Sequence, residues 1–568
     1  MSFSGLLAQL DEGLSSLVGQ WNIYSTGIVT VLVLLITYSI TSRVEPEIHP
    51  MLLARQGHGS PVRQEGESPI YRSNAAPHSM PLNSGLNVKE AGASKWSQGR
   101  DGDLRDIWRK AVSGSENEGA KGKGRILTVL GSEKVIEHKL DDVTRQINLV
   151  GQYISSQGGK KVAIYLPNSV EYIATLFACS FYNLTAILLP YDQSEASIIS
   201  MLQQSGADTV VTLPGTFPFD SVVKSYPALR QLIWVVDEGS KHLDWNEVPK
   251  GIGGKVNVST WQDILNDQPQ TAGTELPSID NQAAAPDVVL FWVSKNDSIE
   301  EMVRFTQGNL VSAVSAQLVA IPTKERFSPA DLFLPAAPLS SSYTLILTLV
   351  ALYSNASIAF NSVAGASPDL ALATQGVAPT VIVTTPETLA KTHAETKGKV
   401  TSALASFSHW IQTRSLVQNG VIPLASFLAS YNDSLYPRLG TKPGKLRLVY
   451  VAHLANGSNS PLLSELTLSD LRIFTRARVI YALSAAPCAG AVAQTQFHDY
   501  RVSGDGKGSH FGPPVSSTEI LLRDSGSHKI TDESYTGEVV VRGPAIVGGE
   551  AALGLVATIR DDNTIAVV

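Results

Sequence analysis

The sequence predicts an α/β fold of parallel sheets with helices on both faces, preceded by one apolar helix. Between Lys161 and Thr212, short apolar runs alternate with segments of helical spacing, which is typical of right-handed βαβ units. Of the 568 residues, 43% are hydrophobic and 17% are charged, the balance of a packed globular protein. A third observation is the uncharged run Ile23–Ile40, which precedes this body.

The run Ile23–Ile40 predicts a membrane anchor over residues 21–42. Its 18 residues carry no charge and span about 27 Å as a helix, enough for a thin bilayer such as that of the endoplasmic reticulum. A cleaved signal peptide and a buried core helix are the alternatives, but Asp11 and Glu12 stand where a signal peptide carries basic residues. Aromatic residues suited to the bilayer interface lie in or beside the run: Trp21, Tyr24 and Tyr38.

The residues that flank this run predict its orientation. No Lys or Arg precedes it, and four arginines follow it closely: Arg43, Arg55, Arg63 and Arg72. The positive-inside rule therefore predicts a lumenal tail over residues 1–20 and a cytosolic body. We expect a single-pass protein of the endoplasmic reticulum whose partner is membrane lipid, contacted through Ile23–Ile40.

Charge and cysteine usage exclude several classes of protein. The net charge is −7 and the chain has no dense block of Lys or Arg, which argues against nucleic acid as a partner. Cys179 and Cys488 lie far apart and offer neither a disulfide framework nor metal-ligand spacing. The 11 histidines are also scattered without such spacing. We expect no metal site and a reducing compartment.

Residues 43–124 predict a tether between the anchor and the body. The segment is rich in Gly, Ser and Asn and shows no sustained hydrophobic period. The alternative is a segment that packs back onto the body or onto the membrane surface.

A regular hydrophobic periodicity begins near residue 125. Apolar residues recur at helical spacing and end at Gly158–Gly159: Leu140, Val143, Ile147, Val150 and Ile154. A strand before Pro167, a helix, a strand before Pro190, a second helix and a third strand follow. We therefore predict one α/β domain over residues 125–568.

Three blocks of this domain resemble the adenylate-forming (AMP-binding) superfamily, which includes the acyl-CoA synthetases. Val162–Thr212 resembles the family's large N-terminal domain, and TGEVVVRGPAIVGG (Thr536–Gly549) resembles its strand motif. KLRLVY (Lys445–Tyr450) and Leu462–Ser484 resemble the strand, helix and strand that lead to its adenine pocket. The resemblance implies the large domain of a fatty acid–CoA ligase using ATP, magnesium and CoA, here without the mobile C-terminal domain.

The segment Asp287–Asn309 occupies the place of the family's phosphate loop. It predicts a buried strand, Val288–Val293, a polar turn, Ser294–Ser298, and a helix beginning near Thr306. The family's loop reads aromatic-T-S-G-T-T-G-x-P-K-G-V and is followed by T-H-x-N-L. The corresponding residues here are Trp292, Ser294, Lys295, Asp297, Ser298, Glu300, Glu301 and Thr306, with Gln307 for the histidine.

The phosphate loop differs from the family in its chemistry. Lys295 and Ser298 take glycine positions, and Glu301 takes the position of the lysine. A carboxylate about 4 Å from a phosphate costs about 1–4 kcal/mol. We therefore expect the loop to repel the phosphates of ATP.

Two other motifs also lack residues that bind ligands in the family. In LPAAPLSS, Pro338 stands for the family's histidine and Ser341 for its glycine. The adenine and magnesium motif is YALSA, in which Tyr481 is kept, Ser484 offers a hydroxyl, and Ala485 replaces the glutamate that ligates magnesium. We expect no retained catalytic residue and no bound cofactor.

Two functions fit these observations. The first is a membrane-anchored pseudoenzyme that binds lipid, with a fatty acyl ligand, or serves as a scaffold for a protein partner. The second is a divergent but active long-chain fatty acid–CoA ligase. Leu345–Tyr353 would form a helix beside the family's acyl tunnel or simply pack in the core. Cys488 with His498 could pair as thiol and base, or Cys488 is an ordinary buried cysteine.

Overall fold

The computed structural model describes the chain in two units, Met1–Glu47 and Ile48–Val568. The description leaves out residues 1–14, 17–18, 20–21, 42–44, 91, 95, 115–121, 132–133, 237–255, 279–284, 294–299, 362–364, 366–368, 424–429, 442–444, 458–459, 505, 527 and 532–534.

In the first unit, the apolar run forms the helix α2 (Ile23–Thr41, 19 residues). Asn22 caps its start, because the side-chain oxygen accepts hydrogen bonds from the amides of Tyr24 and Ser25, each 3.0 Å long. The side chains of residues 38–41 lie outside the described ones. Over the residues that the structure describes, no helix is both long enough and apolar enough to cross a membrane. The helix is therefore confirmed, and the membrane span stays a prediction.

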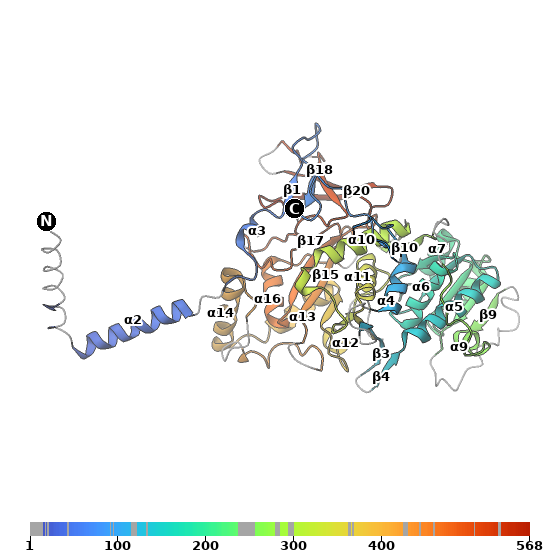
Figure 1. Cartoon of the computed structure of the whole chain (residues 1–568), viewed down its shortest axis with the longest axis horizontal. Helices are drawn as coiled ribbons and strands as arrows, with labels where there is room; N and C mark the ends of the chain where they lie inside the picture. The colour runs from blue at the N-terminus through green and yellow to red at the C-terminus, as the bar shows by residue number, and fades with distance from the viewer. Residues whose placement is uncertain are drawn as a thin grey trace. The chain divides into compact units, whose positions relative to one another are not determined.

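The second unit contains three sheets, which Figure 1 shows together with the helices that cover them. The seven-stranded sheet has the order β11-β10-β6-β5-β7-β8-β9. Its strands are parallel except for the antiparallel pair at one edge, β10 and β11. The strands are β5 (Lys161–Tyr165), β6 (Thr185–Leu188), β7 (Thr209–Thr212), β8 (Gln231–Trp234), β9 (Asn257–Thr260), β10 (Val288–Val293) and β11 (Glu300–Phe305).

The eight-stranded sheet has the order β17-β16-β15-β14-β12-β13-β3-β4 and is parallel except at its two edges. Its strands are β3 (Ile126–Leu130), β4 (Lys134–His138), β12 (Leu332–Pro335), β13 (Ser357–Asn361), β14 (Val381–Thr384), β15 (Leu448–Leu454), β16 (Arg478–Ser484) and β17 (Ala493–Gln494).

The third sheet is antiparallel, with the order β1-β2-β18-β19-β20-β21, and lies at the top of the body in Figure 1. Its strands are β1 (Gly57–Gly59), β2 (Tyr71–Ser73), β18 (Glu519–Arg523), β19 (Thr536–Arg542), β20 (Glu550–Ile559) and β21 (Ile565–Val567). The predicted α/β fold with parallel sheets is confirmed, and this antiparallel sheet was not predicted.

The helices pack on the two parallel sheets as the hydrophobic spacing requires. The five residues predicted to line one face of the first helix are buried in α5, and Gly206 ends α7 in the left-handed conformation, at φ 64°. The helices are α3 (Pro50–Ala54), α4 (Leu104–Ser113), α5 (Leu140–Ser156), α6 (Val170–Phe181), α7 (Glu195–Ser205), α8 (Phe219–Ser225), α9 (Trp261–Asn266), α10 (Gln307–Ala320), α11 (Ser342–Tyr353), α12 (Leu370–Ala373), α13 (Pro386–Lys397), α14 (Ala403–Asn419) and α16 (Glu465–Thr475), with a 3₁₀ turn at Thr323–Glu325.

The prediction of a tether over residues 43–124 is wrong for most of that segment, which packs on the body. Ser68 lies against β18, where its amide donates to the carbonyl of Leu522 and its Oγ accepts from the Leu522 amide, both at 2.8 Å. The helix α4 is fixed by a capping box between Asp103 and Asp106. Its buried residues Leu104, Ile107, Trp108 and Ala111 have helical spacing. Only ten residues long and surrounded by Gly and Ser, this pattern was too short to be detected in the sequence.

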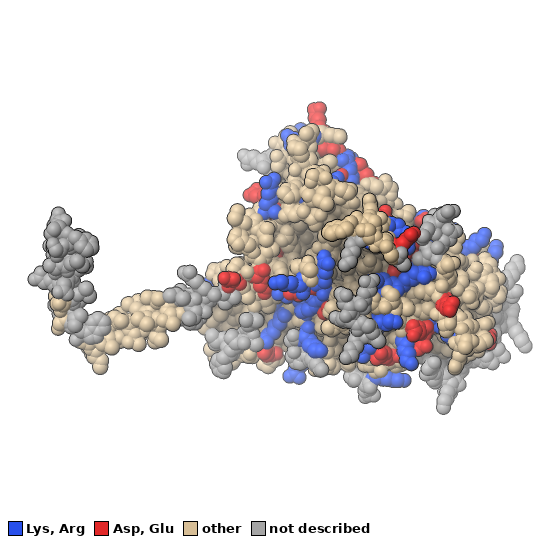
Figure 2. All heavy atoms as spheres, viewed as in Figure 1, with Lys and Arg blue, Asp and Glu red and all other residues tan. Residues whose placement is uncertain are grey.

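The face of the body in view in Figure 2 carries side chains of both charges. Figure 2 shows acidic and basic side chains interspersed over the face in view, whereas the described part of α2 carries none.

Two tryptophans of the N-terminal segment test its packing. Trp108 is 0% exposed, its ring centroid lies 5.0 Å from that of Phe177, and its Nε1 donates to Thr144 Oγ1 at 3.1 Å. Trp96 is 95% exposed. We expect Trp108→Ala to lower the free energy of unfolding in urea by about 3–5 kcal/mol, and the control Trp96→Ala to change it by less than about 0.5 kcal/mol. Equal, small effects would show that α4 is not part of the folded body.

Candidate functional site

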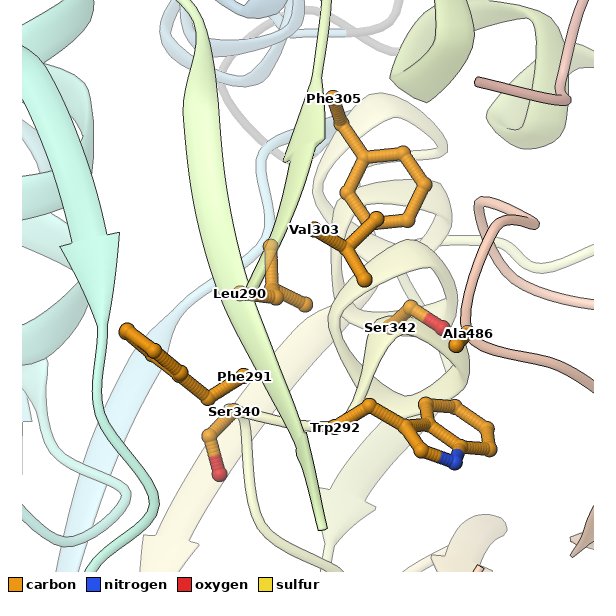
Figure 3. Close-up of a pocket in the computed structure, with 8 residues that line it drawn as sticks. All are labelled: Leu290, Phe291, Trp292, Val303, Phe305, Ser340, Ser342 and Ala486. Atoms are coloured by element: carbon orange, nitrogen blue, oxygen red, sulfur yellow. The ribbon is translucent and has the colours of Figure 1, made fainter. Parts of the chain in front are cut away.

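Three of the sequence motifs meet at one small pocket of the body. About 210 Å³ between its side chains is unfilled when open solvent is counted, but the cavity itself measures only about 10 Å³, the room of about one water molecule. Figure 3 shows its lining: Leu290, Phe291, Trp292, Val303, Phe305, Ser340, Ser342 and Ala486. The hairpin β10–β11, the start of α11 and the turn after β16 supply these residues. None of the eight is ionisable, so the lining is apolar with two hydroxyls.

The hairpin decides which side chains face the pocket. Leu290 pairs with Val303 and Trp292 with Glu301, and directly paired residues point to the same face of a sheet. The side chain of Phe291 points to the other side of the strand in Figure 3. Glu301 therefore lies on the same face of the hairpin as the pocket, one pair beyond Val303 toward the loop that joins the two strands, and it is not itself among the lining residues.

Strand β11 was not predicted from the sequence. A polar turn followed by a helix was expected after Val293, and the structure instead has a second strand, Glu300–Phe305, before the helix. The alternation of apolar Val303 and Phe305 with the charged Arg304 was the sequence pattern that indicates a strand here. The strand gives the matched acidic residue a fixed place at the pocket.

Of the acidic loop residues, Glu301 is the one whose side chain the structure places. It is exposed, and among the described residues none forms an ion pair with it. The side chain of Arg304 points to the opposite face of β11 from that of Glu301. It pairs with Asp287, at 3.7 Å. Ser294, Lys295, Asp297 and Ser298 lie outside the described residues, as does the side chain of Glu300.

Thr306 caps α10 as predicted. Its Oγ1 accepts from the amide of Asn309 at 3.2 Å, and Asn309 Oδ1 accepts from the amide of Thr306 at 2.9 Å, which completes a capping box. Asn309 Nδ2 also donates to the carbonyls of Pro544 and Ile546, at 2.8 and 3.2 Å. These bonds join the start of α10 to the Gly-Pro turn after β19.

Gln307, at the position of the family's histidine, has a structural role. Its Nε2 donates to the carbonyl of Pro286 at 2.7 Å, and its Oε1 accepts from the amide of Leu104 at 3.0 Å. The side chain is buried. It therefore links β10 to the N-terminus of α4, and both of its polar atoms already have partners. Sequence reasoning gave no indication of this link.

Asn168 holds the turn that carries Ser340. Its Nδ2 donates to the carbonyls of Pro335 and Ala337, at 2.9 and 2.8 Å, and its Oδ1 accepts from the amide of Leu339 at 2.8 Å. All three bonds are buried. Because Asn168 follows β5 and the turn follows β12, this amide connects the two parallel sheets beside the pocket.

The YALSA segment is built into the core. Tyr481 is buried, its ring centroid lies 4.8 Å from that of Phe511, and its hydroxyl accepts from the Leu463 amide at 3.1 Å. Burial raises the pKa of Tyr481. The Ser484 hydroxyl, expected to be available to a ligand, is instead buried and donates to the carbonyl of Gly490 at 2.6 Å. Ala485 is buried beside it.

The described residues around the pocket do not fit a magnesium-bound triphosphate. Magnesium takes carboxylate oxygens and the phosphates take cations, whereas the lining supplies two serine hydroxyls and apolar groups. Within the described part of the chain, no three His, Cys, Asp or Glu side chains are placed to hold a metal ion.

The thiol alternative gains no support from the structure. Cys488 is buried, and burial raises its pKa, so the thiol stays protonated. His498 lies against the ring of Phe497, with the two centroids 5.1 Å apart.

Comparison with known proteins agrees with this fold. Residues 140–288 match the family model described as "AMP-binding enzyme". A sequence search of the curated proteins finds no match.

Solved structures with the same fold are adenylate-forming enzymes. The anthranilate CoA ligase AuaEII in complex with anthranoyl-AMP is 14% identical, with a TM-score of 0.55 over 82% of this chain and 77% of that chain. Coronafacic acid ligase from Pectobacterium brasiliense is 14% identical, with a TM-score of 0.54 over 82% and 78%. The inhibitor-bound N-terminal domain of FACL13 from Mycobacterium tuberculosis is 12% identical, with a TM-score of 0.53 over 82% and 99%.

The turn at the pocket can be tested through Asn168. We expect Asn168→Ala to lower the free energy of unfolding by about 2–4 kcal/mol, because buried backbone groups lose their partners. Gln204→Ala is the control, since Gln204 is exposed and its side chain donates to the Ser200 hydroxyl on the same helix. Urea unfolding measures both, and an effect of Asn168→Ala no larger than that of the control would contradict the role given to this amide.

Proposed function

We propose that this chain, which has the fold of the adenylate-forming enzymes, is a pseudoenzyme that has lost ATP-dependent adenylation and serves as a lipid-binding or interaction scaffold. One observation carries the proposal. Among the described residues, none that lines the pocket where three family motifs meet is ionisable, and the exposed carboxylate of Glu301 lies on the same face of the hairpin.

The energetic cost to ATP follows from this chemistry. Losing one charge-assisted bond to phosphate costs about 1.5–3 kcal/mol, and a carboxylate about 4 Å away adds about 1–4 kcal/mol. At about 1.4 kcal/mol per factor of ten, the two terms weaken binding by about 10²- to 10⁵-fold. A nucleotide that an active relative binds with a dissociation constant of about 1 μM would then bind with one of about 0.1 mM to 100 mM.

The lining has the apolar chemistry of a lipid-binding site but not its size. Four of its side chains are Leu290, Trp292, Val303 and Phe305, and ligand pockets are lined mainly by such residues. The cavity itself measures only about 10 Å³, the lower limit for one water molecule, whereas ligand pockets measure about 300–1,000 Å³. An acyl or aryl group could therefore enter only if the lining side chains moved apart. The helix α11, expected beside the family's acyl tunnel, is buried in the core over Leu345–Leu352 and supports the packing alternative.

The membrane anchor is part of the proposal. The described apolar side chains of α2 are exposed, among them Ile28, Leu32 and Leu34, and contiguous exposed apolar surface is characteristic of a contact with lipid or protein. We propose that α2 holds the body at the cytosolic face of the endoplasmic reticulum.

A divergent, active fatty acid–CoA ligase is the second candidate. The preserved cap at Thr306 and its link through Asn309 to the turn after β19 favour it, because these keep the backbone frame in which an active relative would bind nucleotide.

Nucleotide binding separates the two candidates. We expect isothermal titration of the full chain with Mg-ATP, and with a non-hydrolysable acyl-adenylate, to give no saturable heat up to millimolar ligand. Glu301→Lys should strengthen triphosphate binding by tenfold or more over Glu301→Gln, because it restores a cation at the matched position. Saturable binding by the unmodified protein would overturn the pseudoenzyme proposal.

The anchor is tested by extraction of membranes at alkaline pH. The full chain should stay in the membrane pellet, and Leu32→Arg with Leu34→Arg should move it to the soluble fraction, since a charge near the bilayer centre costs about 2.5–3.5 kcal/mol. The conservative pair Leu32→Val with Leu34→Val is the control. Release of the unmodified protein would count against the anchor.

A further inference from the structure

The helix α14 carries a stripe of large apolar side chains on its surface. Leu404, Phe407 and Trp410 are 63%, 52% and 54% exposed, and their spacing of three residues places them on one helix face. The rings of Phe407 and Trp410 stack with centroids 6.0 Å apart, and the guanidinium of Arg414 lies 5.6 Å from the Trp410 ring. We call these four residues the α14 stripe.

The opposite face of α14 is firmly attached to the body. His409 Nε2 lies 2.8 Å from Asp470 Oδ1 on α16, and the Ala405 carbonyl accepts from Asn432 Nδ2 at 3.0 Å. Ala405 and Leu416 are fully buried. The stripe is therefore a fixed feature of the folded surface and not a core face that failed to dock.

The surroundings of the stripe have an unusual charge balance. In a chain of net charge −7, the 37 residues 396–432 contain no Asp or Glu and three basic residues, Lys397, Lys399 and Arg414. Lys397 pairs with Asp470 of α16 at 2.9 Å, so Lys399 and Arg414 supply the positive charge near the stripe. Aromatic and leucine side chains beside basic residues suit the interface of an anionic bilayer.

The position of the stripe also points to lipid. In Figure 1, α14 and α3 both lie at the left edge of the body, and Met51 and Leu52 of α3 are exposed. Ile48, the first residue of the body, follows the end of α2 at Thr41 by seven residues. Seven residues reach at most about 25 Å, so the chain itself limits the distance between Ile48 and the end of α2 to that length.

We infer that the α14 stripe, together with α3, lies on the surface of an anionic lipid bilayer and orients the body on it. The inference rests on the proposed anchoring by α2. It adds a second contact, which fixes the face of the body that the membrane covers.

A fluorescent probe at position 410 tests the inference in the full chain. Both native cysteines are buried, so in Trp410→Cys an environment-sensitive thiol dye should label position 410 selectively. We expect its emission to shift to the blue in phosphatidylcholine vesicles with 30% phosphatidylserine. In vesicles of pure phosphatidylcholine the shift should be at least twofold smaller. Ala196→Cys is the control, because Ala196 is exposed on α7, at the right of the body in Figure 1, and its probe should not shift.

The outcomes separate this inference from the anchoring itself. Failure of the chain to float with vesicles would overturn both. If the chain floats but the probe at position 410 does not shift, or the probe at position 196 shifts equally, the contact of the stripe with lipid is contradicted and the anchoring is not. A shift of equal size in neutral vesicles would overturn the anionic preference, and a shift that grows with protein density at fixed lipid composition would assign the stripe to a second copy of the chain.

Discussion

The buried carboxamide of Asn168 is the constraint on which the site depends. It follows β5 in one sheet and bonds three backbone groups of the turn after β12 in the other. Buried backbone groups without partners are costly, so this turn is held whether or not any nucleotide binds. The pocket wall at Ser340 and Ser342 is therefore maintained by folding, independently of catalysis.

Several positions that match the family's functional residues take part in this folding. Gln307 links β10 to α4 through both of its polar atoms. Ser484 donates its hydroxyl inside the chain. A side chain whose hydrogen-bonding capacity is already used inside the protein has little left for a ligand. Glu301, by contrast, is exposed and has no ion-pair partner among the described residues.

The repeated units of the body could be predicted because their signals are local. Apolar runs before Pro167 and Pro190 became parallel strands, and the spacing from Leu140 to Ile154 became a helix. The strands β1 and β2 were missed because three residues carry no period and their sheet is completed only by β18, more than 400 residues away. The hydrogen bonds of Asn168 and Gln307 could not be predicted from the sequence, because they join residues far apart in the chain. The partners of Asn168 lie more than 160 residues away, and one partner of Gln307 lies 203 residues away. Motif matching found the segments that form the pocket, while only the pairing of Trp292 with Glu301 showed where the carboxylate lies.

The central claim is that a carboxylate and an uncharged lining have replaced the phosphate-binding chemistry of this fold. Fatty-acid-dependent exchange of radioactive pyrophosphate into ATP tests it most directly, because the exchange requires both nucleotide binding and acyl-adenylate formation. We predict no exchange above the rate without protein, across short, medium and long acyl chains. Exchange that depends on one acyl chain length and saturates with ATP would contradict the claim.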